Sequence, residues 1–390
     1  GDVNNDGYDD FVVGAPDWKP LELGRGLGRV CLFLGAAEGI PRNPHVVLLN
    51  PGNTDGFGWT LASAGDINSD GCSDVLVAAP GWAGSSNPGD VYAYAGSPSG
   101  LAAAPVWTVS GEQAGSAFGH GLAGNGDING DGFDDVIIGA PNLGDDMAYQ
   151  GRAYVYPGSA DGLADVPAWT AAGETDNACF GNAVSLCGDI NADGYDDALI
   201  GAPRHSGPLD SQGMLYVYLG SEAGLAGEPT AVHGGGQAGA QAGMAVSGPG
   251  DIDGDGYGDY VFGLPGHDSA GGMDNGRAVV LRGADEIGNL PWWALESGQA
   301  FAGLDVQVAG AGDVNGDGFD DLLIGLPSAD CWAVDDDAGM ALVFYGSGGG
   351  ARLESAWHAF GEQDNGGHFG YAVSSAGDVN GDGYGDVLLG

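Results

Sequence analysis

Basic side chains are almost missing from this sequence, which has one lysine (Lys19) and eight arginines among 390 residues. The 54 acidic residues outweigh them and give a formal net charge of −45. Binding to nucleic-acid phosphates requires clusters of Lys and Arg. The composition therefore argues against nucleic acid as a partner.

Long apolar runs and cysteine are also scarce. No stretch approaches the ~20 apolar residues of a membrane-spanning helix, so no membrane span is predicted in this sequence. The five cysteines show no metal-type spacing, and their odd number fits no closed disulfide framework. We therefore expect free and mostly buried thiols at Cys31, Cys72, Cys179, Cys187 and Cys331.

What the sequence does have is one nine-residue pattern, written seven times. In the third copy it reads Asp127-Ile-Asn-Gly-Asp-Gly-Phe-Asp-Asp135. Side chains with oxygen atoms stand at positions 1, 3, 5 and 9, and a glycine at position 6 allows a sharp turn with positive φ. The other copies begin at Asp2, Asp66, Asp189, Asp251, Asp313 and Asp378.

The spacing of these oxygens predicts a metal-binding loop. Carboxylates forced this close repel one another unless a cation lies between them. Ca²⁺ accepts six to eight oxygens at irregular angles, and it suits the pattern better than Mg²⁺ does. An Asp/Gly-rich turn that binds nothing is the alternative for a single copy, but seven copies favour about seven calcium sites.

Position 7 is expected to contribute its backbone carbonyl, while its side chain packs elsewhere. The predicted ligands are Asp2, Asn4, Asp6, Tyr8 and Asp10; Asp66, Asn68, Asp70, Cys72 and Asp74; Asp127, Asn129, Asp131, Phe133 and Asp135; Asp189, Asn191, Asp193, Tyr195 and Asp197; Asp251, Asp253, Asp255, Tyr257 and Asp259; Asp313, Asn315, Asp317, Phe319 and Asp321; Asp378, Asn380, Asp382, Tyr384 and Asp386.

The EF-hand loop begins in a similar way but requires a bidentate Glu at position 12. Here position 12 is apolar in every copy, for example Val77 and Ile138. The ninth residue leads directly into an apolar run such as Val136–Gly139. The loop is therefore predicted to join one strand to another.

Four apolar segments return with a period of 61–65 residues, and none has helical periodicity. In the third unit these are 118–124, 136–141, 151–158 and a last strand that carries Trp169. The third strand is bracketed by glycines seven residues apart, such as Gly151 and Gly158. Four strands per repeat predict an all-β fold, a β-propeller of four-stranded antiparallel blades. An open β-solenoid is the alternative, but its repeats are usually only about 20–30 residues long.

The repeated Phe-Gly and Gly-Ala-Pro elements resemble the FG-GAP repeat of integrin α-subunit propellers and secreted bacterial proteins. Phe-Gly stands at 57–58, 118–119, 180–181 and 369–370, and Gly-Ala-Pro at 14–16, 139–141 and 201–203. Ala242-Gly243, Ala302-Gly303, Gly263-Leu-Pro265 and Gly325-Leu-Pro327 depart from the pattern. The resemblance implies a seven-bladed propeller with calcium loops on one rim and partner binding mostly on the opposite face.

The first unit is expected to contribute three strands, the five complete units four strands each, and the last unit two strands, which gives 25 in all. We therefore predict seven blades, the first and last incomplete, in a single domain over 1–390. The repeats run approximately over 1–56, 57–117, 118–179, 180–241, 242–301, 302–368 and 369–390. Because both ends fall inside a repeat, the sequence is expected to be a fragment of a longer chain.

The loops between second and third strands share no pattern, and several carry aromatic residues. Exposed aromatics on loops over a rigid scaffold often bind protein or stack on sugar rings. Trp18, Trp82, Tyr149 and Trp332 are therefore candidate ligand-binding residues, although these side chains could equally fold back and cap the blade edges. His205 and His267 in the same loops lack a Ser or Cys partner pattern and are interpreted as non-catalytic. Trp107, Trp169, Trp293 and Trp357 recur with the repeat and are interpreted as packing residues.

Together these features predict a calcium-binding, secreted or cell-surface module that binds an extracellular protein or glycan and is not an enzyme. A propeller-fold enzyme such as a glycan lyase or hydrolase, or the non-catalytic propeller of a larger secreted enzyme, is the alternative. An enzyme would need acid, base and positioning residues that converge on one pocket.

Overall fold

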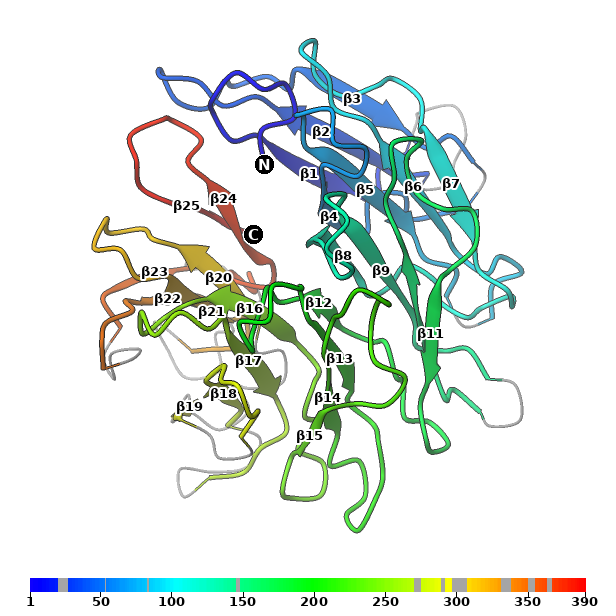
Figure 1. The fold of residues 1–390 in the computed structure, drawn as a ribbon, viewed down its shortest axis with the longest axis vertical. Coiled ribbons are helices and arrows are strands. Elements are labelled where there is room, and N and C mark those ends of the chain that lie inside the picture. The colour runs from blue at the N-terminus through cyan, green and yellow to red at the C-terminus, as the bar shows by residue number, and fades with distance from the viewer. Residues whose placement is uncertain are drawn as a thin grey trace. The chain divides into compact units, whose positions relative to one another are not determined.

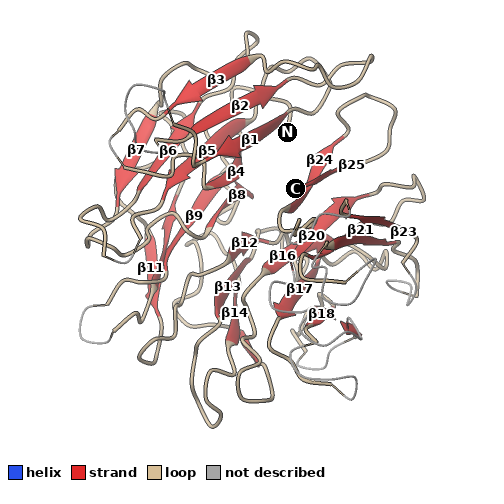
Figure 2. Cartoon of the chain, turned by 180° about the vertical axis from the view of Figure 1, so that it is seen from behind, coloured by secondary structure: helices blue, strands red, loops and turns tan. Residues whose placement is uncertain are grey.

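The fold is given by a computed structural model. It describes residues 1–19, 27–52, 54–82, 84–144, 148–269, 275–288, 292–296, 307–330, 338–349, 355–362 and 367–390. Within these ranges the regular structure is strand throughout, with no helix (Figure 2). The predicted all-β class is confirmed.

The described residues form 25 strands, in agreement with the strand count expected from the sequence. They are β1 (Phe11–Ala15), β2 (Arg29–Phe33), β3 (Val46–Leu49), β4 (Thr60–Gly65), β5 (Asp74–Ala79), β6 (Asp90–Tyr94), β7 (Trp107–Ser110), β8 (Leu122–Gly126), β9 (Asp135–Ala140), β10 (Arg152–Tyr156), β11 (Trp169–Ala172), β12 (Val184–Leu186), β13 (Ala198–Ala202), β14 (Met214–Tyr218), β15 (Ala231–Gly234), β16 (Val246–Gly250), β17 (Asp259–Leu264), β18 (Arg277–Leu281), β19 (Trp293–Glu296), β20 (Gln307–Gly312), β21 (Asp321–Leu326), β22 (Met340–Phe344), β23 (Trp357–Phe360), β24 (Val373–Gly377) and β25 (Asp386–Leu389).

The strands pair in chain order into antiparallel sheets. Five sheets have four strands: β4-β5-β6-β7, β8-β9-β10-β11, β12-β13-β14-β15, β16-β17-β18-β19 and β20-β21-β22-β23. First strands of successive sheets lie side by side, as β4 does with β8 and β16 with β20 (Figure 1). Four-stranded antiparallel sheets that meet through their first strands are the blades of a β-propeller.

The number of blades differs from the prediction of seven. The structure has six, the five four-stranded sheets and the three-stranded sheet β1-β2-β3. The last sheet contains only β24 and β25. A two-stranded hairpin is too small to form an independent layer, so the loop pattern at 378–386 was wrongly counted as a blade of its own.

Contacts between Cα atoms divide the chain into two compact units. Unit 1 contains 1–186, 220–225 and 378–382, and unit 2 contains 187–219, 226–377 and 383–390. Each unit has its own apolar cores. In unit 1, Leu76 of β5, Val136 of β9 and Tyr154 of β10 belong to one buried cluster. In unit 2, Val261, Leu322 and Phe344 belong to another.

The second strand of each complete blade is an apolar run that is buried on both faces. All six residues of β5, β9, β17 and β21 are buried, as are all five of β13. Alternate side chains of such a strand point to opposite faces of the sheet. Each second strand is therefore covered from two sides.

The Phe-Gly and Gly-Ala-Pro elements meet in space, which explains why they occur together. A Cβ atom on Gly139 in β9 would lie 1.9 Å from the carbonyl oxygen of Gly181 in the next repeat. The same contact joins Gly201 to Gly243, again at 1.9 Å. These backbones approach too closely for any side chain, and both partners are main chain that cannot rotate away.

Two of the four recurring tryptophans have the packing role that was predicted for them. The Trp107 ring packs against Tyr156 at 5.2 Å, and the Trp293 ring against Phe344 at 5.1 Å. In both cases the partner lies in the third strand of the following sheet. Trp169 is half-buried, whereas Trp357 is 43% exposed, because the β24-β25 sheet that follows it has no third strand.

We predict that Gly139→Ala lowers the free energy of unfolding by about 3 kcal/mol, because the new methyl group would overlap main-chain atoms. The urea-unfolding midpoint at fixed calcium concentration measures this loss. Gly227→Ala is the matched control, since nothing lies within 4 Å of a Cβ atom there. Equal midpoints for the two variants would contradict the explanation of the repeated glycine.

Candidate functional site

Six of the seven predicted metal loops lead into the second strand of their sheet, and the first loop leads into β1. The third loop runs from the end of β8 at Gly126 to the start of β9 at Asp135. Asp74, Asp259 and Asp321 begin their strands in the same way. Strands on both sides confirm that these are not EF-hand loops, which lie between helices.

The loops turn through two residues with positive φ. Glycine at position 6 has φ between 87° and 92° in all seven loops, as the sequence predicted. Position 4 is also left-handed in every loop, although it is glycine in only four of them. The other three are Asn5, Ser69 and Ala192, with φ of 55°, 57° and 57°. This second turn was not recognised in the sequence because its residue type varies.

The carboxylate at position 1 lies inside the turn. In the third loop, Oδ1 of Asp127 accepts the Asp131 N–H at 3.1 Å, and Oδ2 accepts the Gly132 N–H at 2.8 Å. Position 5 turns inward as well, since Asp131 Oδ1 accepts the Phe133 N–H at 3.1 Å. Oδ1 of Asp127 also accepts the Gly130 N–H at 2.7 Å, so three backbone N–H groups hold this carboxylate inside the turn.

The carboxylate at position 9 is buried and has a structural role of its own. Asp135, which is 1% exposed, accepts the Ile128 N–H on Oδ2 at 3.1 Å and the Gly158 N–H on Oδ1 at 2.9 Å. Gly158 is the closing glycine of the bracket around the third strand. The same pair of bonds recurs at Asp10, Asp74, Asp259 and Asp321.

Burial makes the charge at position 9 costly. It raises the pKa of Asp135 to about 7, an effect that the N–H donors of Gly158 and Ile128 oppose and that Asp131 and Asp127 increase. Burial likewise raises the pKa of Asp259 to about 7 and that of Asp74 to about 6. A nearby cation stabilises the charged form of such a carboxylate.

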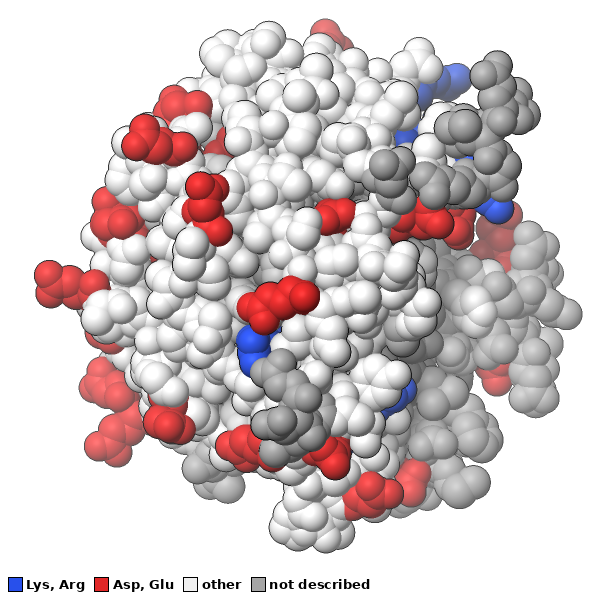
Figure 3. All heavy atoms as spheres, turned by 90° about the vertical axis from the view of Figure 1, so that its right-hand side faces the viewer, with Lys and Arg blue, Asp and Glu red and all other residues white. Residues whose placement is uncertain are grey.

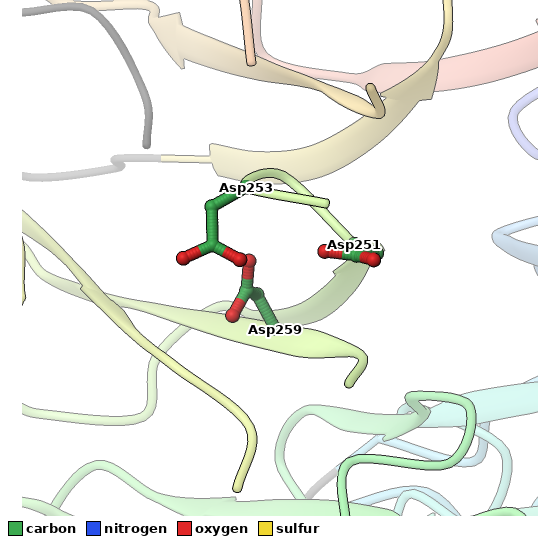
Figure 4. Close-up of side chains that lie close together, drawn as sticks. All are labelled: Asp251, Asp253 and Asp259. Atoms are coloured by element: carbon green, nitrogen blue, oxygen red, sulfur yellow. The ribbon is translucent and has the colours of Figure 1, made fainter. Parts of the chain in front are cut away.

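The fifth loop brings three predicted ligands together. One carboxylate oxygen from each of Asp251, Asp253 and Asp259 lies within 4.8 Å of the others, and the side chains converge beside the start of β17 (Figure 4). Asp255, at position 5, is not in this group. This loop alone has Asp at position 3, where the other loops have Asn.

A basic side chain from outside this loop, Arg282 directly after the end of β18, contacts one of the three carboxylates. Arg282 pairs with Asp253 at 2.9 Å and lies over the Trp292 ring at 3.9 Å. Burial raises the pKa of Asp253, and Arg282 opposes this rise. The guanidinium would therefore compete with a metal for one of the three carboxylates.

In the first and fourth loops the polar side chains at positions 3 and 5 are neighbours. Asn4 Nδ2 donates to Asp6 Oδ2 at 2.9 Å, and Asn191 Nδ2 donates to Asp193 Oδ2 at 2.9 Å. Asn presents its side-chain oxygen to a cation as well as its amide to an anion. The predicted donor set therefore fits a hard cation in its chemistry, while the position-7 carbonyls stay a prediction.

Trp82, a predicted ligand residue, belongs to a surface group of aromatic rings. Its ring lies edge-on to Trp59 at 5.0 Å and to His120 at 5.4 Å. Trp59 is 46% and Trp82 37% exposed. His120 donates through Nδ1 to the Asn182 carbonyl at 2.9 Å, and burial lowers the pKa of its imidazole. We call Trp59, Trp82 and His120 the aromatic group.

Trp59 and His120 were not identified from the sequence. Both directly follow a Phe-Gly pair, a position that holds Asn182 and Tyr371 in other repeats. The residue after the Phe-Gly pair varies from repeat to repeat, and this variation is the feature of the sequence that could have identified Trp59 and His120. Neither residue lies in a loop between a second and a third strand, where the candidate ligand-binding residues were predicted.

The other predicted ligand residues behave differently. Arg29 covers the Trp18 ring at 5.3 Å, and the Trp18 carbonyl accepts the N–H groups of Leu27 and Gly28, so Trp18 packs onto its own blade. Tyr149 is 43% exposed and has a φ of 48°. Trp332 lies outside the described residues.

Cysteine and histidine have no visible chemical role in the described residues. Cys31, Cys72 and Cys187 are free thiols, the last two buried. Cys179 is buried too, and Cys331 is outside the described residues. His205 is buried beside the Tyr216 hydroxyl at 3.2 Å, and His267 contacts Gln237 and Arg277.

Unit 2 contains a cavity of about 510 Å³ beside β15, β17 and β18. His233, Phe262 and Arg277 line it, and His233 contacts the Tyr260 hydroxyl at 3.1 Å. None of the described residues that line it is Asp or Glu. It therefore lacks the pair of carboxylates that glycoside hydrolysis uses.

Five segments of the sequence match the FG-GAP repeat: residues 1–32, 57–94, 122–156, 180–218 and 306–344. This chain carries FG-GAP repeats. The segments 57–94, 122–156 and 180–218 open at a first strand or at the Phe-Gly pair before it, and each includes a metal loop and a third strand.

Integrin α subunits are similar in sequence to part of this chain. Integrin alpha-5 of Xenopus laevis is 31% identical over 166 residues, which are 40% of this chain and 15% of the relative. Integrin alpha-7 of Rattus norvegicus is 35% identical over 161 residues, 41% of this chain and 14% of the relative. The FG-GAP chain therefore matches only a small part of these relatives.

Among solved structures, BBS1N in complex with ARL6DN is similar at a TM-score of 0.44 and 12% identity, covering 86% of this chain and 83% of that one. A similarity at this level indicates no function. No helix of the described residues is long and apolar enough to cross a membrane.

The left-handed conformation of Ala192 in the fourth loop generates a prediction. An L-residue in this region costs about 1–2 kcal/mol, so Ala192→Gly should raise the free energy of unfolding by up to about 1 kcal/mol after its entropic cost. Gly132→Ala in the third loop is the reverse control and should destabilise, because φ there is 88°. Urea unfolding of both variants tests this, and destabilisation by Ala192→Gly would contradict it.

Proposed function

We propose that this FG-GAP chain is a calcium-binding, extracellular adhesion-type module that binds a protein or glycan through its aromatic group. The observation that carries the metal part is the shared geometry of seven loops, each with inward carboxylates and the same two left-handed turns. The similarity to integrin α subunits supports the adhesion-type assignment.

In this proposal, side chains at positions 1, 3, 5 and 9 and the carbonyl at position 7 hold each ion. A divalent cation would neutralise the clustered carboxylates and fix the loop against the start of the second strand. Calcium is preferred over magnesium because the donors come from an irregular loop, and Ca²⁺ tolerates irregular angles. The converging trio in the fifth loop supports the same chemistry.

Calcium binding also bears on where the protein is located, because the sites fill only where free calcium is high. At about 1 mM free calcium, sites with dissociation constants of roughly 10–100 µM would each stabilise the fold by roughly 1.4–2.7 kcal/mol. Cytosolic calcium would leave such sites mostly empty. A secreted or cell-surface location therefore suits this chain, and the excess of acidic over basic side chains in Figure 3 fits a partner other than nucleic acid.

The metal proposal predicts that the chain binds close to seven Ca²⁺ and that Asp131→Ala removes one of them, because Asp131 is a ligand of the third loop only. Equilibrium dialysis measures the stoichiometry. Asp161→Ala, an exposed acid of the same repeat, is the matched control and should leave it unchanged.

Chelation should lower the melting temperature, and Ca²⁺ should restore it better than Mg²⁺ or Na⁺ at matched ionic strength. Saturation at one or two ions would count against the seven-loop proposal. Equal rescue by all three cations would show that screening of the −45 charge is the cause.

The aromatic group is the proposed partner surface because it combines half-exposed indole rings with a rigid support. Trp59 precedes β4 directly, and His120 is tied to the next repeat through Asn182. Tryptophan rings supply large contact areas at low entropic cost, for proteins and for sugar rings alike. Trp18, covered by Arg29, is not part of this proposal.

Replacing Trp59 and Trp82 together by Ala should weaken partner binding about tenfold or more, since buried tryptophans dominate interfaces. A glycan array and a panel of purified extracellular matrix proteins identify the partner with the wild-type chain and then compare the variant. Trp357→Ala, equally exposed at 43%, is the control. Unchanged binding by the double variant would exclude the aromatic group.

We propose no catalytic function. The cavity in unit 2 offers His233 and Arg277 but no carboxylate among its described lining residues. Burial lowers the pKa of His233 to about 4, so its imidazole is neutral near pH 7. Without a partner acid this arrangement does not supply the acid, base and positioning groups that a lyase or hydrolase requires.

A further inference from the structure

Neighbouring metal loops contact each other through position 8, a residue that the predicted ligand set leaves out. Asp134 of the third loop accepts the N–H of Asp66, the first residue of the second loop, at 2.6 Å. In return the Asp134 N–H donates to the Asp66 carbonyl at 3.3 Å. Two hydrogen bonds therefore clamp position 1 of one loop to position 8 of the next.

The same clamp occurs at two other junctions. Asp320 of the sixth loop accepts the Asp251 N–H at 2.9 Å and donates to its carbonyl at 3.2 Å. Asp9 of the first loop accepts the Asp378 N–H at 2.8 Å and donates to its carbonyl at 3.0 Å. At all three junctions the position-8 carboxylate accepts the N–H of position 1 in the neighbouring loop, and position 1 is a proposed metal ligand.

Three other junctions provide an internal comparison. Position 8 is Ser73, Gly258 or Gly385 there, so no carboxylate is available. The backbone half of the clamp remains, since each of these residues donates its N–H to Asp2, Asp189 or Asp313 at 2.9 Å. The carboxylate bond is therefore an addition at particular junctions and not a requirement of the fold.

A second contact strengthens two of the clamped junctions. The position-7 ring of one loop lies over the position-4 glycine of the preceding loop. A Cβ atom on Gly254 would lie 2.6 Å from the Phe319 ring, and one on Gly381 would lie 2.6 Å from the Tyr8 ring. These rings limit the movement of the turn that carries the proposed ligands at positions 3 and 5.

The position of the clamp in the sequence gives it a consequence for metal binding. Position 8 lies between the proposed ligands at positions 7 and 9, so a metal bound in its own loop would fix it. Its carboxylate would then hold position 1 of the preceding loop in place. A loop that is already ordered binds its ion with a smaller entropic cost.

We propose that Asp9, Asp134 and Asp320 couple calcium binding between neighbouring loops, so that occupation of one loop raises the affinity of the loop preceding it. This inference rests on the proposed calcium function. These aspartates are positioning residues that act through position 1 of the neighbouring loop. By linkage the coupling is reciprocal in equilibrium affinity.

The test follows calcium binding loop by loop in the full chain. The position-6 glycine N–H donates to the position-1 carboxylate, as Gly71 does to Asp66 at 2.7 Å and Gly132 to Asp127 at 2.8 Å. Its amide resonance in a ¹H–¹⁵N spectrum should shift when that carboxylate binds a metal. Titration with Ca²⁺ then gives a separate midpoint for the second and third loops.

Asp134→Ala should weaken calcium binding at Gly71 by at least about fivefold, within the usual range of allosteric coupling. The midpoint at Gly132 should change by less than that, because the lost carboxylate contacts the second loop. Asp134→Asn keeps a hydrogen-bond acceptor and should restore part of the affinity. Ser73→Ala is the matched control, and it should leave the Gly7 midpoint unchanged.

A double-mutant cycle separates coupling from a local structural effect. Asp131→Ala, which empties the third loop, should weaken binding at Gly71 in the wild-type background. In the Asp134→Ala background the same change should have no further effect. Additive effects, or an unchanged Gly71 midpoint in Asp134→Ala, would overturn the coupling.

The two proposals fail in different ways. If no loop glycine shifts with Ca²⁺ and dialysis finds no bound ion, the calcium function itself is wrong. If the glycine amide resonances shift with Ca²⁺ but their midpoints do not change when position 8 is replaced, only the coupling is wrong. Should Asp134→Ala fail to fold, Asp320→Ala read at Gly256 and Gly318 tests the same clamp at another junction, with the same outcomes deciding.

Discussion

A buried carboxylate at the ninth position of the loop is the interaction on which each blade depends. Asp135 accepts one N–H from the start of its own loop and one from the end of the third strand, so one side chain ties together the loop, the second strand and the third strand. Burying this charge is costly unless every oxygen is satisfied. The fold therefore fixes the geometry of the loop before any ion is considered, and a bound cation would offset the remaining cost.

Close backbone contacts impose the second constraint, because they determine where the repeats can meet. Gly139 lies so close to the Gly181 carbonyl oxygen of the next repeat that no side chain fits between them. Such contacts place the residues after each Phe-Gly pair beside the neighbouring sheet, as the chain of hydrogen bonds from Thr60 through His120 to Asn182 shows. The motif that joins the blades therefore also positions the aromatic group, so packing and the proposed binding surface share one scaffold.

Much of this architecture could be predicted from the sequence, and the reasons are local. Short apolar runs, glycine brackets and the strand–loop–strand pattern depend on neighbouring residues. In the third repeat the second and third strands formed where these patterns placed them, whereas β8 begins at Leu122 and not at Phe118. The blade count was not a local property. The loop at Asp378 has every expected residue, but it is followed by a hairpin of two strands, and whether two strands form a blade depends on what packs beside them.

The sequence by itself determined the loop chemistry, the positive φ at position 6 and the burial of the second strands, because each follows from residue type and spacing. Only the tertiary structure decided which residues meet across repeats. Trp59 and Trp82 are 23 residues apart, and Asp134 reaches Asp66 across 68 residues, so no local pattern marks either contact. Position 8 is not among the ligand positions predicted from the sequence. Its role became visible only where one loop lies against the next, because long-range contacts depend on how whole repeats pack.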